Sequence, residues 1–297
     1  MTYQGSHRAR FRKRKLQTGI LKFPAEPQLV NTRQMAHRHL TLKGQFCYHQ
    51  VVSRYVADRE LIIYLPPSYA HTRQHYPVIY MHDGNNLFDP ATGFMGREWC
   101  LDETLEQLFL TQSIPECIVV GIYNTPDRLD EYTWHAHHHM GHPCGGKGPD
   151  YARFVVEELM PFIEVNYRVD LNPENTLLMG SSLGAIISFY IAAAYPGRFQ
   201  KVAMMSPTVY WAHHQILHDV QYFPKGLKLW VDIGTEEGRN RHTEETVEST
   251  QEFVHALEQQ GYQQPFDLGF YIDYLVGHDE HAWANRVERP LRYLLNT

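Results

Sequence analysis

Short apolar runs alternate with helically spaced apolar residues along this chain, and the alternation predicts a sheet covered by helices. Segment 46–65 alternates apolar and polar positions and stops at Pro66-Pro67, which predicts antiparallel leading strands. Continuous apolar runs predict buried strands at 77–81, 117–122, 177–181, 201–205, 227–233 and 266–274. Helical spacing predicts helices over 101–110, 243–260 and 281–295. A further helix is predicted to begin at an N-cap, Asp150, and to bend at Pro161. This order favours the α/β class, with a mostly parallel central sheet covered on both faces.

The segment 177–187 joins one of these strands to a helix through Gly180-Ser181-Ser182-Leu183-Gly184. A G-x-S-x-G motif between strand and helix is typical of a nucleophile elbow. The sharp turn holds its serine in a strained backbone conformation, and small residues at Gly180 and Gly184 let strand and helix come close. We therefore predict Ser182, rather than Ser181, as a nucleophile, and the amide of Leu183 as an oxyanion donor.

Candidates for a base and an acid follow the serine in the chain. A serine hydroxyl needs a base to take its proton, and the base needs a third group to orient it. One strand runs into Gly234-Thr235-Glu236-Glu237-Gly238, and the next ends in Val276-Gly277-His278. This is the serine, acid, histidine order of α/β-hydrolases. His278 is preferred to His281 because it directly follows Gly277, where the chain leaves the strand.

The turn His82-Asp83-Gly84-Asn85-Asn86 follows the strand at 77–81. In this architecture that turn supplies a second oxyanion amide, and we expect Asn85 to provide it. Preorganised donors of this kind contribute about 2.7–4 kcal/mol each. The alternative is that the turn needs Asn and Gly only for its backbone geometry.

Four segments in this order resemble the "Putative esterase" family, which includes esterase D-like, enterochelin-esterase-like and feruloyl carbohydrate-esterase enzymes. They are Tyr80–Asp89, similar to its HDGxNLFD segment, the elbow, Gly234–Glu237, and Gly277–Trp283, similar to its G-H-x-E-x-x-W ending. The resemblance covers about Val51 to Leu294. It implies an α/β-hydrolase fold with Ser182 as nucleophile, His278 as base and Glu237 as acid. Glu236 as the acid, or a Ser182–His278 dyad, stays open.

Aromatic and histidine residues elsewhere are candidates for a pocket or a metal site. We expect Asn86, Tyr210 and Trp211 to line the substrate pocket, with ordinary packing as the alternative. Five histidines, His135, His137, His138, His139 and His142, lie in a Gly-rich segment with Cys144. Their spacing matches no metal-ligand motif, so we expect exposed loop histidines and no metal.

Composition and charge narrow the class of protein. The 297 residues, 43% of them hydrophobic, suffice for one large catalytic domain, which we place at 46–297 after a basic, extended arm at 1–45. Six basic residues lie in 8–15, so the rest carries 21 basic against 33 acidic groups, which argues against nucleic-acid binding. We expect no membrane span and no cleaved secretory signal. Four widely spaced cysteines predict buried free thiols in a reducing cytoplasm.

These observations together predict a serine esterase that hydrolyses a small-molecule carboxylic ester through an acyl-enzyme, without a cofactor. One alternative is a thioesterase or acyltransferase similar to S-formylglutathione hydrolase. Another is a hydrolase-fold protein that binds metal or acts as a scaffold without turnover. The sequence leaves the substrate and the oligomeric state open.

Overall fold

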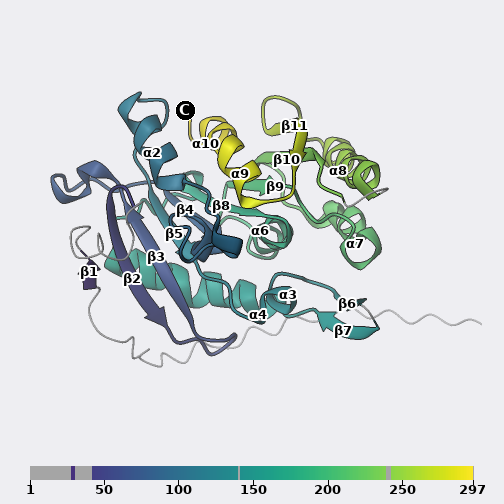
Figure 1. Cartoon of the computed structure of the whole chain (residues 1–297), viewed down its shortest axis with the longest axis horizontal. Helices are drawn as coiled ribbons and strands as arrows, with labels where there is room; N and C mark the ends of the chain where they lie inside the picture. The colour runs from purple at the N-terminus through teal and green to yellow at the C-terminus, as the bar shows by residue number, and fades with distance from the viewer. Residues whose placement is uncertain (1–27, 31–41, 140, 239–241, 297) are drawn as a thin grey trace, which may run out of the picture.

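The computed structural model describes residues 28–30, 42–139, 141–238 and 242–296, and a nine-stranded sheet runs through it (Figure 1). The strand order is β1-β2-β3-β5-β4-β8-β9-β10-β11. The pairings from β5 to β11 are parallel, whereas those among β1, β2, β3 and β5 are antiparallel. The strands are β1 (Gln28–Val30), β2 (Gln45–Val51), β3 (Arg59–Leu65), β4 (Val78–His82), β5 (Ile118–Ile122), β8 (Thr176–Ser181), β9 (Lys201–Met205), β10 (Lys228–Glu236) and β11 (Leu268–Gly277). The α/β class predicted from the sequence is confirmed.

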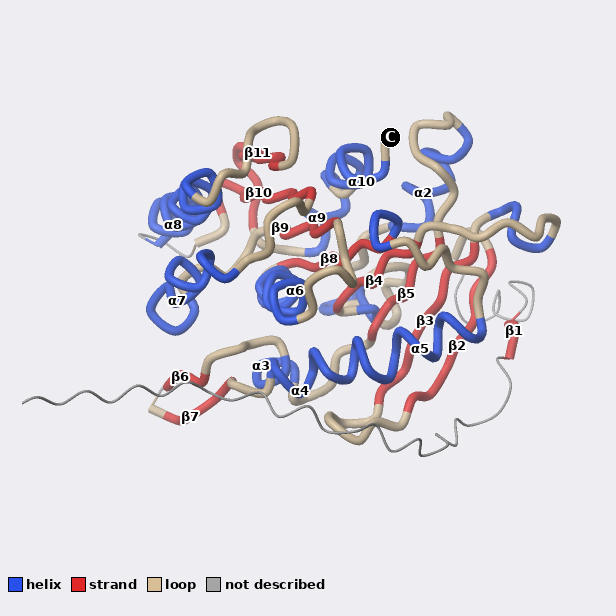
Figure 2. Tube along the Cα trace, turned by 180° about the vertical axis from the view of Figure 1, so that it is seen from behind, coloured by secondary structure: helices blue, strands red, loops and turns tan. Residues whose placement is uncertain are grey.

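Helices cover both faces of this sheet, as Figures 1 and 2 show. Alternate side chains of each central strand enter two different cores, so that Tyr80 joins one and Met81 the other. The first core includes residues of α4 (Gly148–Arg153), α5 (Met160–Asn166), α6 (Leu183–Ala194), α7 (Trp211–Asp219) and α8 (His242–Gln259). The second includes residues of α2 (Leu101–Leu110), α9 (Glu280–Arg286) and α10 (Glu288–Leu295). Strands buried on both faces explain the continuous apolar runs of the sequence.

Two predictions about helix boundaries are wrong here. The helix near residue 150 begins at Gly148 after Lys147, so Asp150 lies inside its first turn and is not the N-cap. A π-helical segment, Phe154–Leu159, joins α4 to α5 without a break in the helical backbone, and Pro161 follows just after it. The closing helix is two helices, α9 and α10, and Asp279 caps the first by accepting a hydrogen bond from Ala282 N.

The histidine-rich segment is a hairpin rather than a loop. Its strands are β6 (Ala136–His139) and β7 (His142–Gly145), with α3 (Arg128–Glu131) just before them. Most of the predicted N-terminal arm lies outside the described residues, but Gln28–Val30 pairs antiparallel with β2. All four cysteines are free, and the expectation of burial is wrong for Cys100, which is exposed. No helix in the described ranges is both long and apolar enough to cross a bilayer.

Candidate active site

Ser182 occupies the turn between β8 and α6 in a conformation that L-residues seldom adopt. Its backbone has φ 57° and ψ −122°, and its amide donates to Met205 O on the neighbouring strand at 2.9 Å. Ser181 is buried in β8, whereas Ser182 is half-buried. Gly180 is sterically required, because a Cβ there would lie 2.7 Å from the backbone carbonyl carbon of Gly184. The turn therefore presents one serine of the pair at the carboxyl edge of the sheet.

The structure brings His278 and Glu237 together beside this edge. His278 follows the end of β11, and its Nδ1 lies 2.8 Å from Glu237 Oε2. Glu237 is the first residue after β10, because that strand continues through Glu236 instead of ending at Ile233 as expected. Glu236 is exposed, while the Glu237 side chain is fully buried. His281 lies on α9 and is exposed.

The other carboxylate oxygen of Glu237 is held by three donors. Glu237 Oε1 accepts from Ser206 Oγ at 2.5 Å, from Gly234 N at 2.6 Å and from Arg286 Nη2 at 3.1 Å. Because backbone N–H and guanidinium groups only donate, Oε1 is the acceptor in these bonds. The other oxygen, Oε2, is thereby left to face His278 Nδ1.

The turn after β4 lies against the start of α6. A Cβ on Gly184 would meet His82 Cβ at 3.2 Å and Asp83 Oδ2 at 3.5 Å. Residues Gly84–Asn86 form one 3₁₀ turn, and the Asn85 side chain donates to Asn86 Oδ1 at 2.8 Å. Leu183 is the first residue of α6, where a helix leaves its amides without intrahelical partners. The end of β4, just before this turn, therefore packs against the first residues of α6.

Asn86 is not among the described residues that line the cavity beside His278. Its side chain is buried and donates to Glu280 Oε1 at 3.1 Å, and it accepts from Phe94 N at 3.0 Å. Burial raises the pKa of Glu280. The contact ties the turn after β4 to the start of α9, and the place of Asn86 in a substrate pocket stays a prediction.

Asp83 and His82 are buried beneath this turn. Arg128 contacts both carboxylate oxygens of Asp83, at 2.7 and 2.8 Å, and Asn124 Nδ2 donates to Oδ1 at 2.6 Å. Burial alone would raise the pKa of Asp83, but Arg128 and Asn124 outweigh it and hold the pKa below its ordinary value. Burial lowers the pKa of His82 to about 3, and its Nδ1 lies 2.9 Å from Tyr151 Oη.

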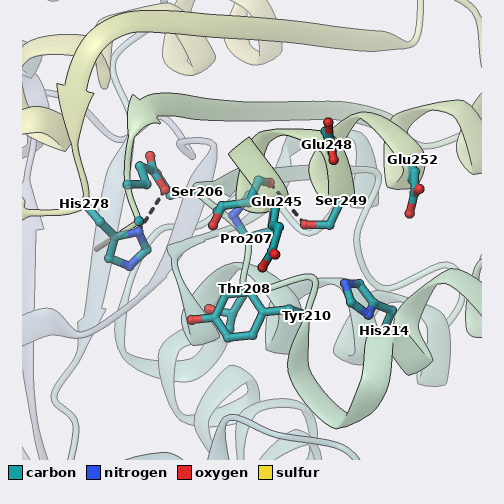
Figure 3. A pocket seen from close by; sticks show the side chains of 13 residues that line it. Ser206, Pro207, Thr208, Tyr210, His214, Glu245, Glu248, Ser249, Glu252 and His278 are labelled. Atoms are coloured by element: carbon teal, nitrogen blue, oxygen red, sulfur yellow. Dashed lines mark hydrogen bonds and ion pairs between the residues drawn. The ribbon is translucent and has the colours of Figure 1, made fainter. Parts of the chain in front are cut away.

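A cavity of about 660 Å³ opens beside His278 (Figure 3). Its walls come from Ser206, Pro207 and Thr208 after β9, from Tyr210 and His214, and from α8 residues such as Thr246 and Ser249. Tyr210 lines this cavity, and its contact with substrate stays a prediction. Residues Ala212, His213 and His214 all have φ between 49° and 61°, so one left-handed turn shapes this wall. Such a turn costs roughly 1–2 kcal/mol per residue.

Trp211 faces the histidine hairpin instead of the cavity. Its indole Nε1 donates to His135 O at 3.0 Å, and its ring lies 5.4 Å from that of His137. His135 Nε2 lies 2.6 Å from Asp219 Oδ2. Over the part of the chain that the structure describes, no three His, Cys, Asp or Glu side chains are placed to hold a metal ion. These contacts dock the hairpin on α7.

The hydroxyl of Ser182 has a partner on the cavity wall. Ser182 Oγ and Thr208 Oγ1 are 3.1 Å apart and share a hydrogen bond. Thr208 also donates its amide to Ser182 O at 3.4 Å. Candidate nucleophile, cavity wall and the His278–Glu237 pair thus belong to one continuous site. The sequence gives no signal for Thr208, Ser206 or Arg286, because their spacing carries no motif.

Comparisons with known proteins match this chain to esterases. The model of the family described as "Putative esterase" matches residues 53–294. The uncharacterized protein YbbA of Bacillus subtilis (strain 168) is 29% identical over 228 residues, which cover 74% of this chain and 84% of YbbA. Ferri-bacillibactin esterase BesA of the same organism is 27% identical, over 50% of this chain and 53% of BesA.

Solved structures share the fold at lower identity. The BES protein from Bacillus cereus superposes with a TM-score of 0.67 at 20% identity, covering 84% of this chain and 94% of that one. The enterobactin esterase FES from Shigella flexneri gives a TM-score of 0.66 at 18% identity, over 84% of this chain and 59% of that one. At these identities the likeness concerns the fold alone.

Proposed function

This chain belongs to the "Putative esterase" family, and on that basis we propose that it is a serine esterase acting through an acyl-enzyme. Ser182 is the nucleophile, His278 the general base and Glu237 the acid that orients it. The observation that carries the proposal is the 2.8 Å contact between His278 Nδ1 and the buried Glu237 carboxylate, at the sheet edge where the strained Ser182 lies. A base and its orienting acid placed near such a serine support nucleophilic catalysis.

Acylation begins when Ser182 Oγ turns from Thr208 toward His278 Nε2. Catalytic hydrogen bonds are often long in the free enzyme and tighten when substrate binds. Oγ attacks the ester carbonyl carbon as Nε2 takes the hydroxyl proton, and the carbonyl electron pair moves onto oxygen. The amides of Leu183 and Asn85 stabilise this oxyanion. The tetrahedral intermediate then expels the alcohol, which receives the proton from His278.

Deacylation repeats these steps with water. His278 takes a proton from the attacking water, the oxyanion forms again, and the carboxylic acid leaves as Ser182 recovers its proton. Glu237 keeps its proton-free form throughout and stabilises the imidazolium that forms twice in each cycle. The protein groups supply the whole reaction, and no cofactor is needed.

The substrate is a small carboxylic ester with a bulky part that fits the cavity of about 660 Å³. This volume lies within the range of small-molecule sites. Because Tyr210 forms one wall, an aromatic or acyl group is the part expected there. Two proteins similar to this chain carry the words bacillibactin and enterobactin esterase in their names, so siderophore esters are the first natural substrates to test.

Fluorophosphonate labelling followed by peptide mapping tests the proposal. We expect one adduct, on Ser182, and loss of both labelling and ester hydrolysis in Ser182→Ala, with turnover reduced at least about 10⁴-fold. Ser181→Ala is the matched control and should keep both. Label on Ser181, or an unlabelled protein that still hydrolyses esters, would contradict the assignment.

A substrate panel completes the test. It pairs simple oxygen esters with feruloyl esters, siderophore esters and matched thioesters, all measured as kcat/KM. Oxygen esters should be preferred. A preference for thioesters would instead make the enzyme a thioesterase with the same three residues.

A further inference from the structure

Behind Glu237 lies a buried pair of charges that the proposed mechanism does not use. Asp232 on β10 and Arg286 on α9 are joined by a contact of 2.9 Å between Oδ1 and Nε, and both side chains are at most 1% exposed. The other oxygen of Asp232 accepts from Trp230 Nε1 at 2.7 Å. Because both partners only donate, Asp232 is a carboxylate. A buried ion pair is costly unless its remaining polar atoms are satisfied, so its presence here calls for a reason.

Arg286 reaches both acids at once. Its Nε contacts Asp232, and its Nη2 contacts Glu237 Oε1 at 3.1 Å and donates to Ser206 Oγ. Ser206 also accepts from Trp283 Nε1 at 2.9 Å, so its own proton goes to Glu237. The planar guanidinium fork therefore fixes one oxygen of Glu237, which leaves the other oxygen facing His278.

The charges in this cluster do not cancel. Two carboxylates, Asp232 and Glu237, share one guanidinium, so the buried group carries a net charge of minus one. If Asp232 were neutral, Arg286 would cancel the charge of Glu237. With Asp232 ionised, Glu237 keeps an uncompensated negative charge toward the imidazole. An imidazolium on His278 then makes the whole cluster neutral.

We propose that Arg286 and Asp232 are positioning residues for the catalytic acid: Arg286 fixes the Glu237 carboxylate, and Asp232 offsets the charge of Arg286. The proposal rests on the proposed function, since it assigns these residues to the base of that reaction. It gives a physical reason for a fully buried aspartate in the middle of a strand, where it cannot reach the histidine itself. It also explains why α9 follows the His278 loop directly.

Other charged groups face His278 and stay unchanged in the test. Glu280 at the start of α9 is buried and bonded to Asn86, and the exposed pair of Asp279 and Arg97, 2.9 Å apart, lies on the same side. Tyr210 lies near Glu237 across the cavity, and its pKa is raised mainly by burial. His214 of α7 and three glutamates of α8 line the same cavity as His278, namely Glu245, Glu248 and Glu252. None of these groups contacts Asp232, so Asp232→Asn removes one negative charge and leaves the others unchanged.

The deciding experiment compares pH profiles of kcat/KM for Asp232→Asn and Trp230→Phe with the wild type. Asp232→Asn removes the negative charge, so protonating the base becomes less favourable and the acidic limb moves about one pH unit to lower pH. The amide can still accept from Arg286, but its NH₂ group meets Trp230 Nε1. Trp230→Phe loses the same hydrogen bond without changing charge, and its limb should stay in place.

Arg286→Lys separates charge from geometry. One ammonium keeps the charge but cannot span both carboxylates, so kcat should fall about 10-fold with the acidic limb unmoved. Thermal midpoints show whether each variant is folded. If Asp232→Asn does not fold, the double variant Trp230→Phe/Asp232→Asn replaces it, because it removes the clash between the new NH₂ group and Trp230 Nε1. An unmoved limb in the charge-removing variants, or an equal shift in Trp230→Phe, overturns the inference. A wild type without Ser182-dependent hydrolysis would instead overturn the proposed function.

Discussion

At the residue scale, the fold separates two pairs of identical neighbours. Ser181 is buried in β8 while Ser182 sits at the turn, and Glu236 is exposed while Glu237 is buried against His278. Successive side chains at the end of a strand point in opposite directions, so only one of each pair can face the site. The single-residue variants of each pair therefore make matched tests.

Glu237→Gln should lower kcat about 10²–10³-fold, because the amide offers the wrong partner to Nδ1 or to the donors on Oε1. Glu236→Gln should change kcat less than about 2-fold, since its side chain is exposed. Steady-state kinetics of the two variants measure this directly. Equal activity in both would favour a Ser182–His278 dyad.

At the element scale, the contact between β8 and α6 depends on the absence of side chains at two glycines. Gly180→Ala would place a methyl group 2.7 Å from the Gly184 backbone, which cannot move aside as a flexible side chain could. We expect a loss of about 1–3 kcal/mol in the free energy of unfolding. Gly277→Ala is the control, since a Cβ there meets nothing nearer than 3.7 Å. Urea titration of both variants decides, and similar losses would contradict the close-packing argument.

Helix α8 forms the wall of the cavity opposite the site, and Ser249 is a buried residue of that wall. Ser249→Phe should fill the cavity and lower kcat/KM for long-chain or aromatic esters at least about 10-fold, while acetyl esters change less than about 2-fold. Gln251→Phe adds the same ring to an exposed position of α8. If both variants treat all chain lengths alike, the bulky group binds elsewhere.

At the scale of the whole molecule, the site is assembled from segments that only the sheet brings together. The ends of β4, β8, β9, β10 and β11 supply the turn Gly84–Asn86, Ser182, Ser206, Glu237 and His278, and parallel strands align these ends at one edge. Sites in open α/β sheets occur at this edge for the same reason. His82, which is buried at the end of β4, makes the free energy of unfolding depend on pH.

Because burial lowers the pKa of His82 to about 3, the native state excludes a proton that the unfolded chain binds below about pH 6.5. This contribution to stability is therefore complete above pH 6.5 and is lost as the pH falls toward 3. Its slope is about 1.4 kcal/mol per pH unit in that window. His82→Gln should remove this slope from unfolding free energies measured by urea titration at pH 5 and 7. An unchanged pH dependence would contradict the buried neutral imidazole.

Much of the fold and of the candidate site followed from the sequence. The strands predicted at 201–205 and 117–122, and the helix at 101–110, agree with β9, β5 and α2 to within a residue, because their apolar runs are continuous and their ends are marked by polar turns. The elbow between β8 and α6 could be located because Gly180 is sterically required there. The pairing of Glu237 with His278 followed from the family resemblance and strand order.

Tertiary structure alone decided what surrounds these residues. Arg286 and Asp232 lie 54 positions apart in the chain, so no local pattern reveals that they meet behind Glu237. Asn86 and Trp211 pack against α9 and the histidine hairpin because long-range contacts, rather than their residue types, set their directions. Local patterns in the sequence, such as periodicity and turn residues, indicate which groups can react. Which charges and walls those groups meet depends on how distant elements pack.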